Sequence, residues 1–359
     1  VIIGAGFAGL YMLHRLRNRG MRACVLEQGD DVGGTWYWNR YPGARCDVES
    51  LQYSFSFSPE IESEWNWSER YSPQAEILAY LRFVADRLEL RRDIVFGATV
   101  TAATYDEAAA LWQVVTEAGE RFEARFVITA TGCLSASRVP DIEGLEGFKG
   151  QWFHTGQWPH EAVDFAGKRV AVIGTGSSGI QAIPVIAAEA GHLTVLQRTP
   201  NFTIPAWNNP QNPERLAEWR GGTPALRAAA KASRSGILYD YGTRSALEVD
   251  DAERKREFEA RWAKGGTNFT HAFNDIFTQE AANALASEFV RDKIRSIVKD
   301  PAIAATLLPH DHGIGTKRIC VDTDYFETFN RPNVDLVDLR SDPIEAVTPE
   351  GIRFASGER

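Results

Sequence analysis

Two segments of this chain carry residues suited to binding the phosphates of a dinucleotide. Each has the pattern Gly-x-Gly-x-x-Gly, from Gly4 to Gly9 and from Gly174 to Gly179, and each lies between two runs rich in apolar residues. One glycine makes the tight turn, one lets backbone N–H groups approach a pyrophosphate, and one lets helix and strand pack closely. A single motif of this kind is weak, so the residues after it must decide between a nucleotide site and a glycine turn of another α/β fold.

The residue that follows the next expected strand distinguishes the two motifs. After the first motif, the strand Ala23 to Leu26 leads to Glu27, whose carboxylate suits a ribose 2′-OH. After the second, the strand Leu193 to Leu196 is followed by Arg198. An acid would repel a 2′-phosphate, whereas an arginine supplies positive charge and paired donors. The sequence therefore favours NADPH over NADH at the second site; the alternative is that Arg198 is an ordinary surface arginine.

A segment rich in aromatic residues lies between the two motifs. It reads FKGQWFHTGQWP, from Phe148 to Pro159. Alone it would be an ordinary packed linker, because Trp and Phe bury large areas and Gly permits tight turns. Its position indicates a crossover between two nucleotide-binding units.

A second aromatic segment, Gly33 to Ser50, is also rich in glycine and arginine. It is either a rigid aromatic loop or a wall over a flat ring system. In the second case its aromatic side chains form surfaces and the polar groups of Arg45 and Asp47 point inward.

The order of strands and helices predicts an α/β fold with two dinucleotide-binding (Rossmann-like) domains. The first is expected over residues 1–135 and the second over 136–359, with a helical insertion at about 208–309 that contains an N-cap at Thr278 and another at Asp300 before Pro301. The expected helices are Gln74–Leu88 and Ile180–Ala190. The expected strands are Val1–Ile3, Ala23–Leu26, Val95–Val100, Leu111–Val115, Arg121–Phe126, Phe126–Thr129, Arg169–Ile173, Leu193–Leu196, Ile319–Val321, Asp335–Asp338 and Gly351–Phe354, three of them (95–100, 111–115 and 121–126) forming a small antiparallel layer.

Composition narrows the classes of protein. The chain has 359 residues, 44% of them hydrophobic, which allows two domains with sizeable cores, and its net charge of −9 argues against nucleic-acid or membrane partners. Its four cysteines are far apart, which suits the reducing cytoplasm, and no apolar run is long enough to span a membrane. His310, Asp311 and His312 could suggest a metal site, but neighbouring residues in a loop rarely face one ion and no further ligand is near, so no metal site is expected.

The motifs together resemble those of the type I Baeyer–Villiger monooxygenases, close to the group with phenylacetone and steroid monooxygenases. The family signature FxGxxxHxxxWP falls on five residues between the two glycine motifs, and Gly33–Ser50 resembles the family's GG-W-Y-NRYPGA segment. The signature residues are Phe148, Gly150, His154, Trp158 and Pro159. The resemblance covers essentially the whole chain. It also implies that segments beyond Val1 and Arg359, including the part that closes the flavin site, are missing.

The resemblance implies FAD in the first domain, NADPH in the second, and a ketone and O2 as substrates. The expected FAD-binding residues are Gly4, Gly6, Ala8, Gly9, Glu27, Thr35, Trp36, Asp47, Tyr53 and Val100. The expected NADP-binding residues are Gly174, Thr175, Gly176, Ser177, Ser178, Gly179, Arg198, Thr199, Lys317 and Arg318.

The implied reaction inserts one oxygen atom beside a ketone carbonyl, through a C4a-peroxyflavin and a tetrahedral peroxide intermediate, to give an ester or lactone. A fixed cation is needed because negative charge is held on the peroxide and on the adduct. By resemblance that cation is Arg318, with Asp47 orienting it, while Lys317, Arg198 and Thr199 hold the 2′-phosphate. His154 is expected to act in domain gating rather than as an acid.

Two other functions fit part of the sequence. A flavin monooxygenase that oxygenates N or S atoms shares both glycine motifs, but it usually lacks the Trp-Pro ending of the signature. A binding or regulatory protein would keep both nucleotide folds without turnover. Trp158, Pro159 and Arg318 favour the ketone reaction over the first alternative.

Overall fold

A computed structural model describes residues 1–357, which form two compact units. The first consists of Val1–Tyr41, Pro73–Pro140 and Phe153–Glu161, and the second of Pro42–Ser72, Asp141–Trp152 and the chain from Ala162 onward. The sequence predicts one domain boundary near Ser135, whereas each compact unit contains three separate segments of the chain. Hydrogen bonds between distant segments explain the difference, because residues 42–72 pair with the chain near residue 209: the backbone N–H of Arg70 donates to the carbonyl of Asn209 at 2.9 Å.

The first unit contains a parallel sheet in the order β3-β2-β1-β7. Its strands are β1 (Ile2–Ile3), β2 (Val25–Leu26), β3 (Ile94–Val95) and β7 (Ile128–Thr129). The glycine turn after β1 leads into helix α1 (Phe7–Arg17), the arrangement typical of a dinucleotide-binding turn. Helix α4 (Gln74–Arg87) buries Ile77, Leu81 and Val84, three apolar positions at helical spacing. Short helices at Thr35–Trp38 (α2), Arg91–Asp93 and Thr155–Gln157 complete the unit's helical elements.

An antiparallel layer in the first unit has the order β4-β5-β6. Its strands are β4 (Val100–Asp106), β5 (Leu111–Thr116) and β6 (Arg121–Ala124), so the antiparallel layer is confirmed. The expected strand Val95–Val100 is wrong, because residue 95 ends β3 and residue 100 begins β4. Gly97, with φ of 67°, makes the turn between them.

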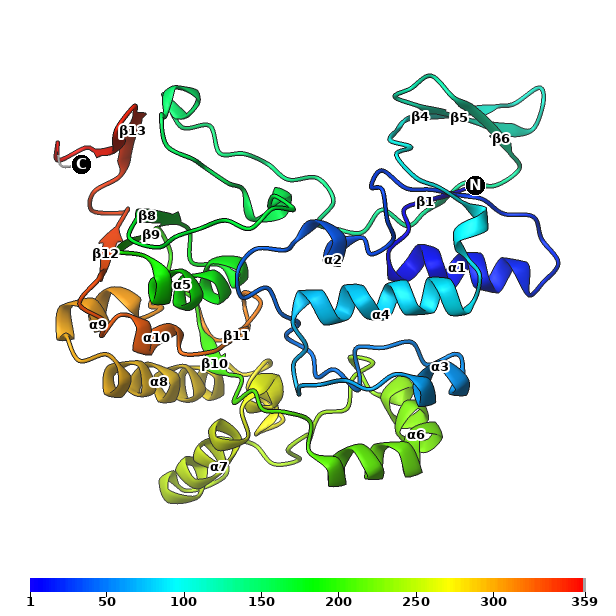
Figure 1. The fold of residues 1–359 in the computed structure, drawn as a ribbon. Coiled ribbons are helices and arrows are strands. Elements are labelled where there is room, and N and C mark those ends of the chain that lie inside the picture. Colours follow the sequence, from blue (N-terminus) through cyan, green and yellow to red (C-terminus); the bar gives the residue numbers. More distant parts are fainter. Residues whose placement is uncertain (358–359) are drawn as a thin grey trace. The chain divides into compact units, whose positions relative to one another are not determined.

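The second unit is built around a parallel sheet in the order β12-β9-β8 (Figure 1). Its strands are β8 (Arg169–Ile173), β9 (His192–Gln197) and β12 (Val334–Asp338), and helix α5 (Ser177–Glu189) connects β8 to β9. A parallel pair, β10 (Thr203–Pro205) and β11 (Cys320–Asp322), and an antiparallel pair, β13 (Ile344–Thr348) and β14 (Gly351–Phe354), are separate sheets. The α/β class is therefore confirmed, and β10 and β13 are strands that the sequence pattern missed.

Residues 208–309, where a helical insertion is expected, are mostly helical in the structure. They contain α6 (Pro213–Ala232), α7 (Asp251–Lys264), a 3-10 helix at Gly266–His271, α8 (Glu280–Ile297) and α9 (Pro301–Leu307). Asp300 caps α9 as expected, since its carboxylate accepts hydrogen bonds from two backbone N–H groups of the first turn. The N-cap expected at Thr278 is wrong, because Gln279 precedes α8. Short helices at Pro59–Glu64 (α3), Leu145–Gly147 and Tyr325–Thr328 (α10) also belong to this unit.

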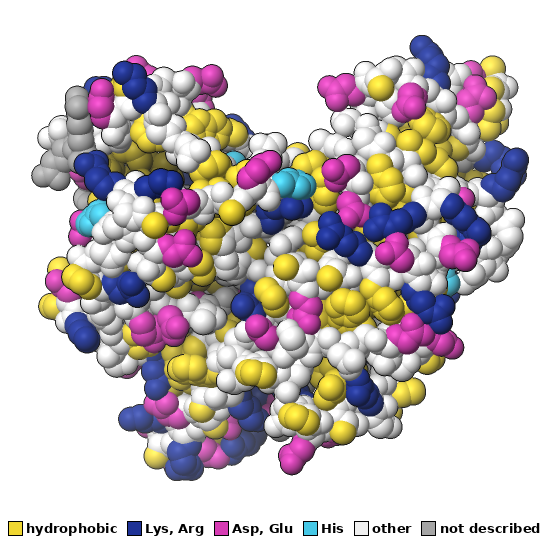
Figure 2. All heavy atoms as spheres, viewed as in Figure 1, with side chains coloured by type: hydrophobic (Ala, Val, Ile, Leu, Met, Phe, Trp, Pro, Cys, Tyr) yellow, Lys and Arg dark blue, Asp and Glu magenta, His cyan; other side chains and the backbone are white. Residues whose placement is uncertain are grey.

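On the face of the molecule seen in Figure 2, basic and acidic side chains are interspersed. Among residues 1–357, no helix has both the length and the apolar character that a membrane span requires. Within the same residues, no group of three or more His, Cys, Asp or Glu side chains is arranged to hold a metal ion.

Candidate active site

The first glycine motif forms a turn that only glycine fits. Gly4 has a φ of 102°, and a Cβ there would lie 2.7 Å from the carbonyl oxygen of Ala130. A Cβ at Gly9 would lie 1.8 Å from the carbonyl oxygen of Gly4. Helix α1 begins after Gly6 and has no side-chain N-cap, so its first backbone N–H groups keep their hydrogen-bonding capacity for an anion.

Glu27 lies under this turn and is 4% exposed. Its two carboxylate oxygens accept hydrogen bonds from the backbone N–H groups of Ala5, at 2.6 Å, and Gly29, at 2.9 Å. The carboxylate therefore holds the glycine turn together in this structure. Its expected contact with a ribose hydroxyl stays a prediction.

The second glycine motif repeats the same geometry before α5. Gly174 has a φ of 102°, and a Cβ at Gly179 would lie 2.2 Å from the carbonyl oxygen of Gly174. A Cβ at Gly176 would meet no atom within 4 Å, and α5 again has no side-chain N-cap. The Thr175 hydroxyl donates to the carbonyl of Thr199 at 3.1 Å, which ties this turn to the residue after the exposed Arg198. The turn thus suits a pyrophosphate at the N-terminus of α5.

Arg318 and Asp47 form an ion pair, although 271 residues separate them in the sequence. Nη2 of Arg318 donates to Oδ2 of Asp47 at 2.9 Å and to the hydroxyl oxygen of Ser177 at 2.8 Å. Within residues 1–357 both hydrogen bonds of the guanidinium use Nη2, so the donors on Nη1 and Nε remain for another partner. The Arg318 side chain is 68% exposed and that of Asp47 is 16% exposed. The positive charge of Arg318 is therefore exposed to solvent, while the carboxylate that pairs with it is largely buried.

The electrostatics of Asp47 follow from its burial. Desolvation raises the pKa of Asp47 to about 6, against the lowering effects of the Arg318 charge and of a hydrogen bond from Gln181. The side-chain nitrogen of Gln181 donates to Oδ1 of Asp47 at 3.2 Å. The carboxyl group thus titrates about one unit below neutral pH, and it is the ionised form that pairs with Arg318.

Two buried thiols flank this ion pair and add no charge to it. Burial raises the pKa of Cys46 to about 12 and also raises the pKa of Cys320. The sulfur of Cys320 lies 3.1 Å from the hydroxyl oxygen of Ser177. Both thiols are therefore neutral near pH 7, which leaves Asp47 as the anion that balances Arg318.

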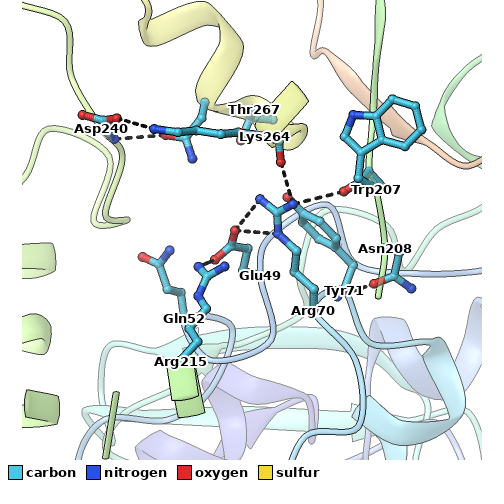
Figure 3. A network of polar contacts seen from close by, with 12 residues as sticks. Glu49, Gln52, Arg70, Tyr71, Trp207, Asn208, Arg215, Asp240, Lys264 and Thr267 are labelled. Atoms are coloured by element: carbon cyan, nitrogen blue, oxygen red, sulfur yellow. Dashed lines mark hydrogen bonds and ion pairs between the residues drawn. The ribbon is translucent and has the colours of Figure 1, made fainter. Parts of the chain in front are cut away.

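A small pocket opens beside Asp47 within the second unit. It is lined by Asp47, Val48, Glu49, Gln52, Tyr71, Ile237, Leu238, Tyr239, Thr267 and Asn268. Some of these residues also belong to a polar network in which Glu49 accepts hydrogen bonds from Arg70 and Arg215 (Figure 3). The pocket is thus lined both by the segment that carries Asp47 and by residues of the helical insertion.

The signature segment makes local contacts in each unit. In the second unit, a Cβ at Gly150 would lie 2.4 Å from the Phe148 ring, so this ring packs directly on the glycine. In the first unit, Nδ1 of His154 accepts a hydrogen bond from the backbone N–H of Gly156 at 3.1 Å. The rings of Phe153 and Trp158 lie 5.3 Å apart. His154 therefore caps the short helix Thr155–Gln157.

A family model described as pyridine nucleotide-disulphide oxidoreductase matches residues 1–237. The Baeyer-Villiger monooxygenase of Pseudooceanicola batsensis is 44% identical over 361 residues, which cover 100% of this chain and 66% of the relative. The solved structure of oxidized steroid monooxygenase bound to NADP is 51% identical with a TM-score of 0.96, over 100% of this chain and 68% of that one. This chain belongs to the type I Baeyer–Villiger monooxygenase family.

Two further similar proteins have names that specify bound cofactors or a reaction. The OTEMO complex with FAD and NADP (form 1) has a TM-score of 0.97 and 43% identity, covering 100% of this chain and 68% of that one. Phenazine N-monooxygenase PhzNO1 of Lysobacter antibioticus is 42% identical over 360 residues, which cover 99% of this chain and 66% of the relative. The chain thus spans about two thirds of the length of the Baeyer–Villiger relatives it matches.

In this Baeyer–Villiger family member, the expected catalytic residues come together and the expected FAD residues are divided. Asp47, Arg318 and Ser177 meet in the second unit. Asp47 and Tyr53 are expected to bind FAD with the first domain, and in the structure residues 42–72 belong to the second compact unit. Thr35, Trp36 and Val100 lie in the first unit, with Trp36 buried at the start of α2.

The basic residues expected at the 2′-phosphate differ in their surroundings. Arg198 and Lys317 are both exposed in the second unit, and Nζ of Lys317 lies 3.9 Å from a carboxylate oxygen of Asp311. The other oxygen of that carboxylate accepts a hydrogen bond from Nδ1 of His312 at 2.6 Å, so Asp311 contacts both Lys317 and His312.

Gln181 belongs to the site although no sequence motif includes it. Its only signal is that it lies four residues after Ser177, on the same face of α5. A pattern that identifies a glycine motif gives no reason to look one turn further along the helix.

Proposed function

We propose that this protein is a Baeyer–Villiger monooxygenase that uses FAD and NADPH. The reaction converts a ketone, O2, NADPH and a proton into an ester or lactone, NADP⁺ and water. The observation that carries the proposal is the Arg318 guanidinium, which Asp47 and Ser177 hold through Nη2 while Nη1 and Nε remain available. Relatives whose names specify Baeyer–Villiger or steroid monooxygenases support the same conclusion.

The two glycine turns fit the two cofactors. Both turns contain a glycine at a φ of 102° and lead into a helix without a side-chain cap, which suits pyrophosphate binding. We assign FAD to the first unit and NADPH to the second, where Arg198 and Lys317 would bind the 2′-phosphate and Thr199 would assist. When bound, reduced FAD supplies the activation of O2 and NADPH supplies the electrons.

Arg318 acts by electrostatics in this proposal. A guanidinium held in place before the reaction stabilises negative charge that develops on an oxygen atom, without reorganising as the charge forms. Because the Arg318 side chain is 68% exposed, solvent screens its attraction to Asp47, and we assign the pair a role in orienting the guanidinium. Ser177 and Asp47 accept hydrogen bonds from the same nitrogen, which fixes the plane of the guanidinium.

The test is product analysis of the full-length protein with FAD and NADPH. We expect esters or lactones from at least one member of a panel of cyclic, aromatic and long-chain ketones, identified by mass spectrometry and counted against NADPH consumed. A yellow holoprotein that consumes NADPH and gives no ester from any ketone would contradict the proposal. A protein that neither binds FAD nor oxidises NADPH would instead favour a binding or regulatory role.

A second candidate is oxygenation of nitrogen or sulfur. The 42% identical relative named phenazine N-monooxygenase favours it. Sulfide oxidation alone does not separate the two reactions, because Baeyer–Villiger enzymes of this family also oxidise sulfides. The discriminating result is oxygenation of an aromatic N-heterocycle together with failure on every ketone.

His154 is proposed to help gating between cofactor states rather than to transfer a proton. Its hydrogen bond to the Gly156 N–H supports a role in shaping the crossover segment. A His154 variant with unchanged flavin reduction, oxygen insertion and coupling would remove this role.

We also propose a cytoplasmic location. All four cysteines, Cys24, Cys46, Cys133 and Cys320, are unpaired in the structure, which suits a reducing compartment.

A further inference from the structure

Three hydrogen bonds join the side-chain amide of Gln181 to one short segment, residues 45–47. Its oxygen accepts from the backbone N–H of Arg45 at 3.3 Å, and its nitrogen donates to the backbone carbonyl of Arg45 at 3.0 Å. The same nitrogen donates to Oδ1 of Asp47 at 3.2 Å. An amide nitrogen has two protons, so both are used.

These contacts fix which way the amide points. If the oxygen and nitrogen exchanged places, the amide oxygen would face the carbonyl of Arg45 and the carboxylate of Asp47, which both only accept hydrogen bonds. The amide nitrogen would then face the backbone N–H of Arg45. The observed orientation forms all three hydrogen bonds, whereas the exchanged orientation would form none of them. Gln181 is therefore a hydrogen-bond donor to Asp47.

Helix α5 thereby holds both members of the ion pair. Ser177 and Gln181 are four residues apart and share a helix face. Ser177 accepts from Arg318, while Gln181 donates to Asp47. The segment before Asp47 also lies close to the helix, because a Cβ at Gly43 would be 2.2 Å from the backbone oxygen of Gln181. Helix α5, which begins at the second glycine turn, therefore contacts both Arg318 and Asp47.

Other contacts also hold this segment. Arg45 pairs with Glu69, and the backbone N–H of Cys46 donates to the carbonyl of Ser72 at 3.2 Å. Figure 3 shows Glu49 between Arg70 and Arg215, with Arg70 also donating to the carbonyl of Lys264 at 2.7 Å. The segment therefore has several anchors besides Gln181, and loss of the amide should not unfold it.

We propose that Gln181 is a positioning residue for the reaction: its amide sets the direction of the Asp47 carboxylate, which in turn sets the direction of the Arg318 guanidinium. The proposal rests on the proposed function, because it assumes that Arg318 acts on the reacting oxygen. Gln181 itself touches neither substrate nor cofactor in this account. Its effect is on the rate of oxygen insertion, through the orientation of Arg318.

Two variants of the full-length, FAD-loaded protein separate positioning from packing. Gln181→Met keeps the length of the side chain but removes the donor, and Gln181→Glu keeps its shape but adds a carboxyl group beside Asp47. The charged or titratable groups that face this position are Asp47 and Arg318, with Cys46 and Cys320 close to both. Two adjacent carboxyl groups resist simultaneous ionisation, so Glu at position 181 should hold its proton to higher pH.

For Gln181→Met we expect kcat for ester formation to fall roughly 10-fold to 100-fold, with the KM for ketone changed much less, because misplacement of a reacting group lowers the rate. NADPH oxidation should continue, so less ester forms per NADPH. For Gln181→Glu we expect ester formation near the wild-type rate at low pH and a new loss as pH rises and the added carboxyl ionises. Gln181→Met should show no such new step.

Gln211→Glu is the matched control. Its side-chain nitrogen donates to the carbonyl of Glu69 at 3.0 Å in the same unit, so the substitution has the same chemistry away from Asp47. We expect a wild-type pH profile for this variant. The same new pH step in Gln211→Glu, or wild-type kcat and coupling in Gln181→Met, would overturn the positioning role.

Two measurements do not depend on turnover. In a crystal structure of Gln181→Met, we expect the Asp47 carboxylate to be rotated and its hydrogen bond to Arg318 to be lost or lengthened; an unchanged pair overturns the proposal. In thermal unfolding, the deficits of both variants relative to wild type should grow as pH rises through about 6, because loss of the amide donor raises the pKa of Asp47 further. The deficit of Gln181→Glu should grow more, because its own carboxyl group also ionises beside Asp47. If the wild-type protein makes no ester, the proposed function fails, while these two measurements still decide whether Gln181 positions Asp47.

Discussion

The hydroxyl oxygen of Ser177 lies 2.8 Å from Nη2 of Arg318, so the first residue of α5 contacts the second of two basic residues before β11. Ser177 was expected to bind NADP as part of the second glycine motif. Its hydroxyl accepts a hydrogen bond from the guanidinium, while its backbone N–H lies in the first turn of α5. One residue thus connects the nucleotide-binding turn to the proposed catalytic cation.

Replacing Arg318 with alanine should abolish ester formation while NADPH oxidation continues. The cation would no longer stabilise charge on the reacting oxygen, and electrons would leave as hydrogen peroxide. Arg318→Lys should also lose at least about 100-fold in ester formation, because a lysine lacks the planar fork of donors that contacts Asp47, Ser177 and a third partner together. Ester and peroxide are measured per NADPH consumed. Ester formation by Arg318→Ala at the wild-type rate would remove Arg318 from the mechanism.

The pKa of Asp47, raised to about 6 by burial, predicts opposite effects of pH on activity and on stability. Activity requires the carboxylate, so kcat should fall about tenfold per pH unit below about 6. Stability changes in the opposite direction, because the pKa of Asp47 in the folded protein lies above its value of 3.8 in an unfolded chain. The contribution of Asp47 to the free energy of unfolding is therefore complete below pH 3.8 and is lost as pH rises through about 6.

Asp47→Asn tests both effects, since an amide does not titrate. The variant should be less active at neutral pH, and the acid limb of its kcat profile should disappear. Its free energy of unfolding relative to wild type should increase between pH 4 and 7, by about 3 kcal/mol at most. Denaturant titrations across this range measure it. An acid limb that persists in Asp47→Asn would assign that titration to another group.

The glycine turns and their helices could be predicted because their causes are local. Gly4 and Gly174 need a positive φ, and the apolar runs on either side specify strand and helix. The Arg318–Asp47 pair could not come from spacing, since it joins residues 271 apart, and only family resemblance indicated it. The placement of residues 42–72 was missed for the same reason: Glu69 accepts a hydrogen bond from Asn208, 139 residues away. Gln181 was missed because one glutamine on an apolar helix gives no distinctive pattern.

Arg198 and Lys317 predict a preference for NADPH. Arg198→Ala and Lys317→Ala should each raise the KM for NADPH by roughly 10-fold, about the value of one hydrogen bond to a charged group, and leave the KM for NADH nearly unchanged. The NADPH effect should weaken as salt concentration rises, because both side chains are exposed. Steady-state kinetics with both nucleotides measure the ratio. Equal changes for NADPH and NADH would place these side chains away from the 2′-phosphate.

Two glycine-to-alanine substitutions in the second unit should have opposite effects on stability. A Cβ at Gly179 would lie 2.2 Å from the backbone oxygen of Gly174, so α5 must move away from the turn, at a cost of about 1–3 kcal/mol.

Gly221 lies inside α6, and a Cβ there would meet no atom within 4 Å. Gly221→Ala should therefore stabilise the protein by up to about 1 kcal/mol through helix propensity. Thermal unfolding measures both changes, and NADP⁺ titration should show weaker binding only for Gly179→Ala, because that substitution displaces the helix N-terminus. Unchanged NADP⁺ affinity in Gly179→Ala would mean that this turn does not bind the pyrophosphate.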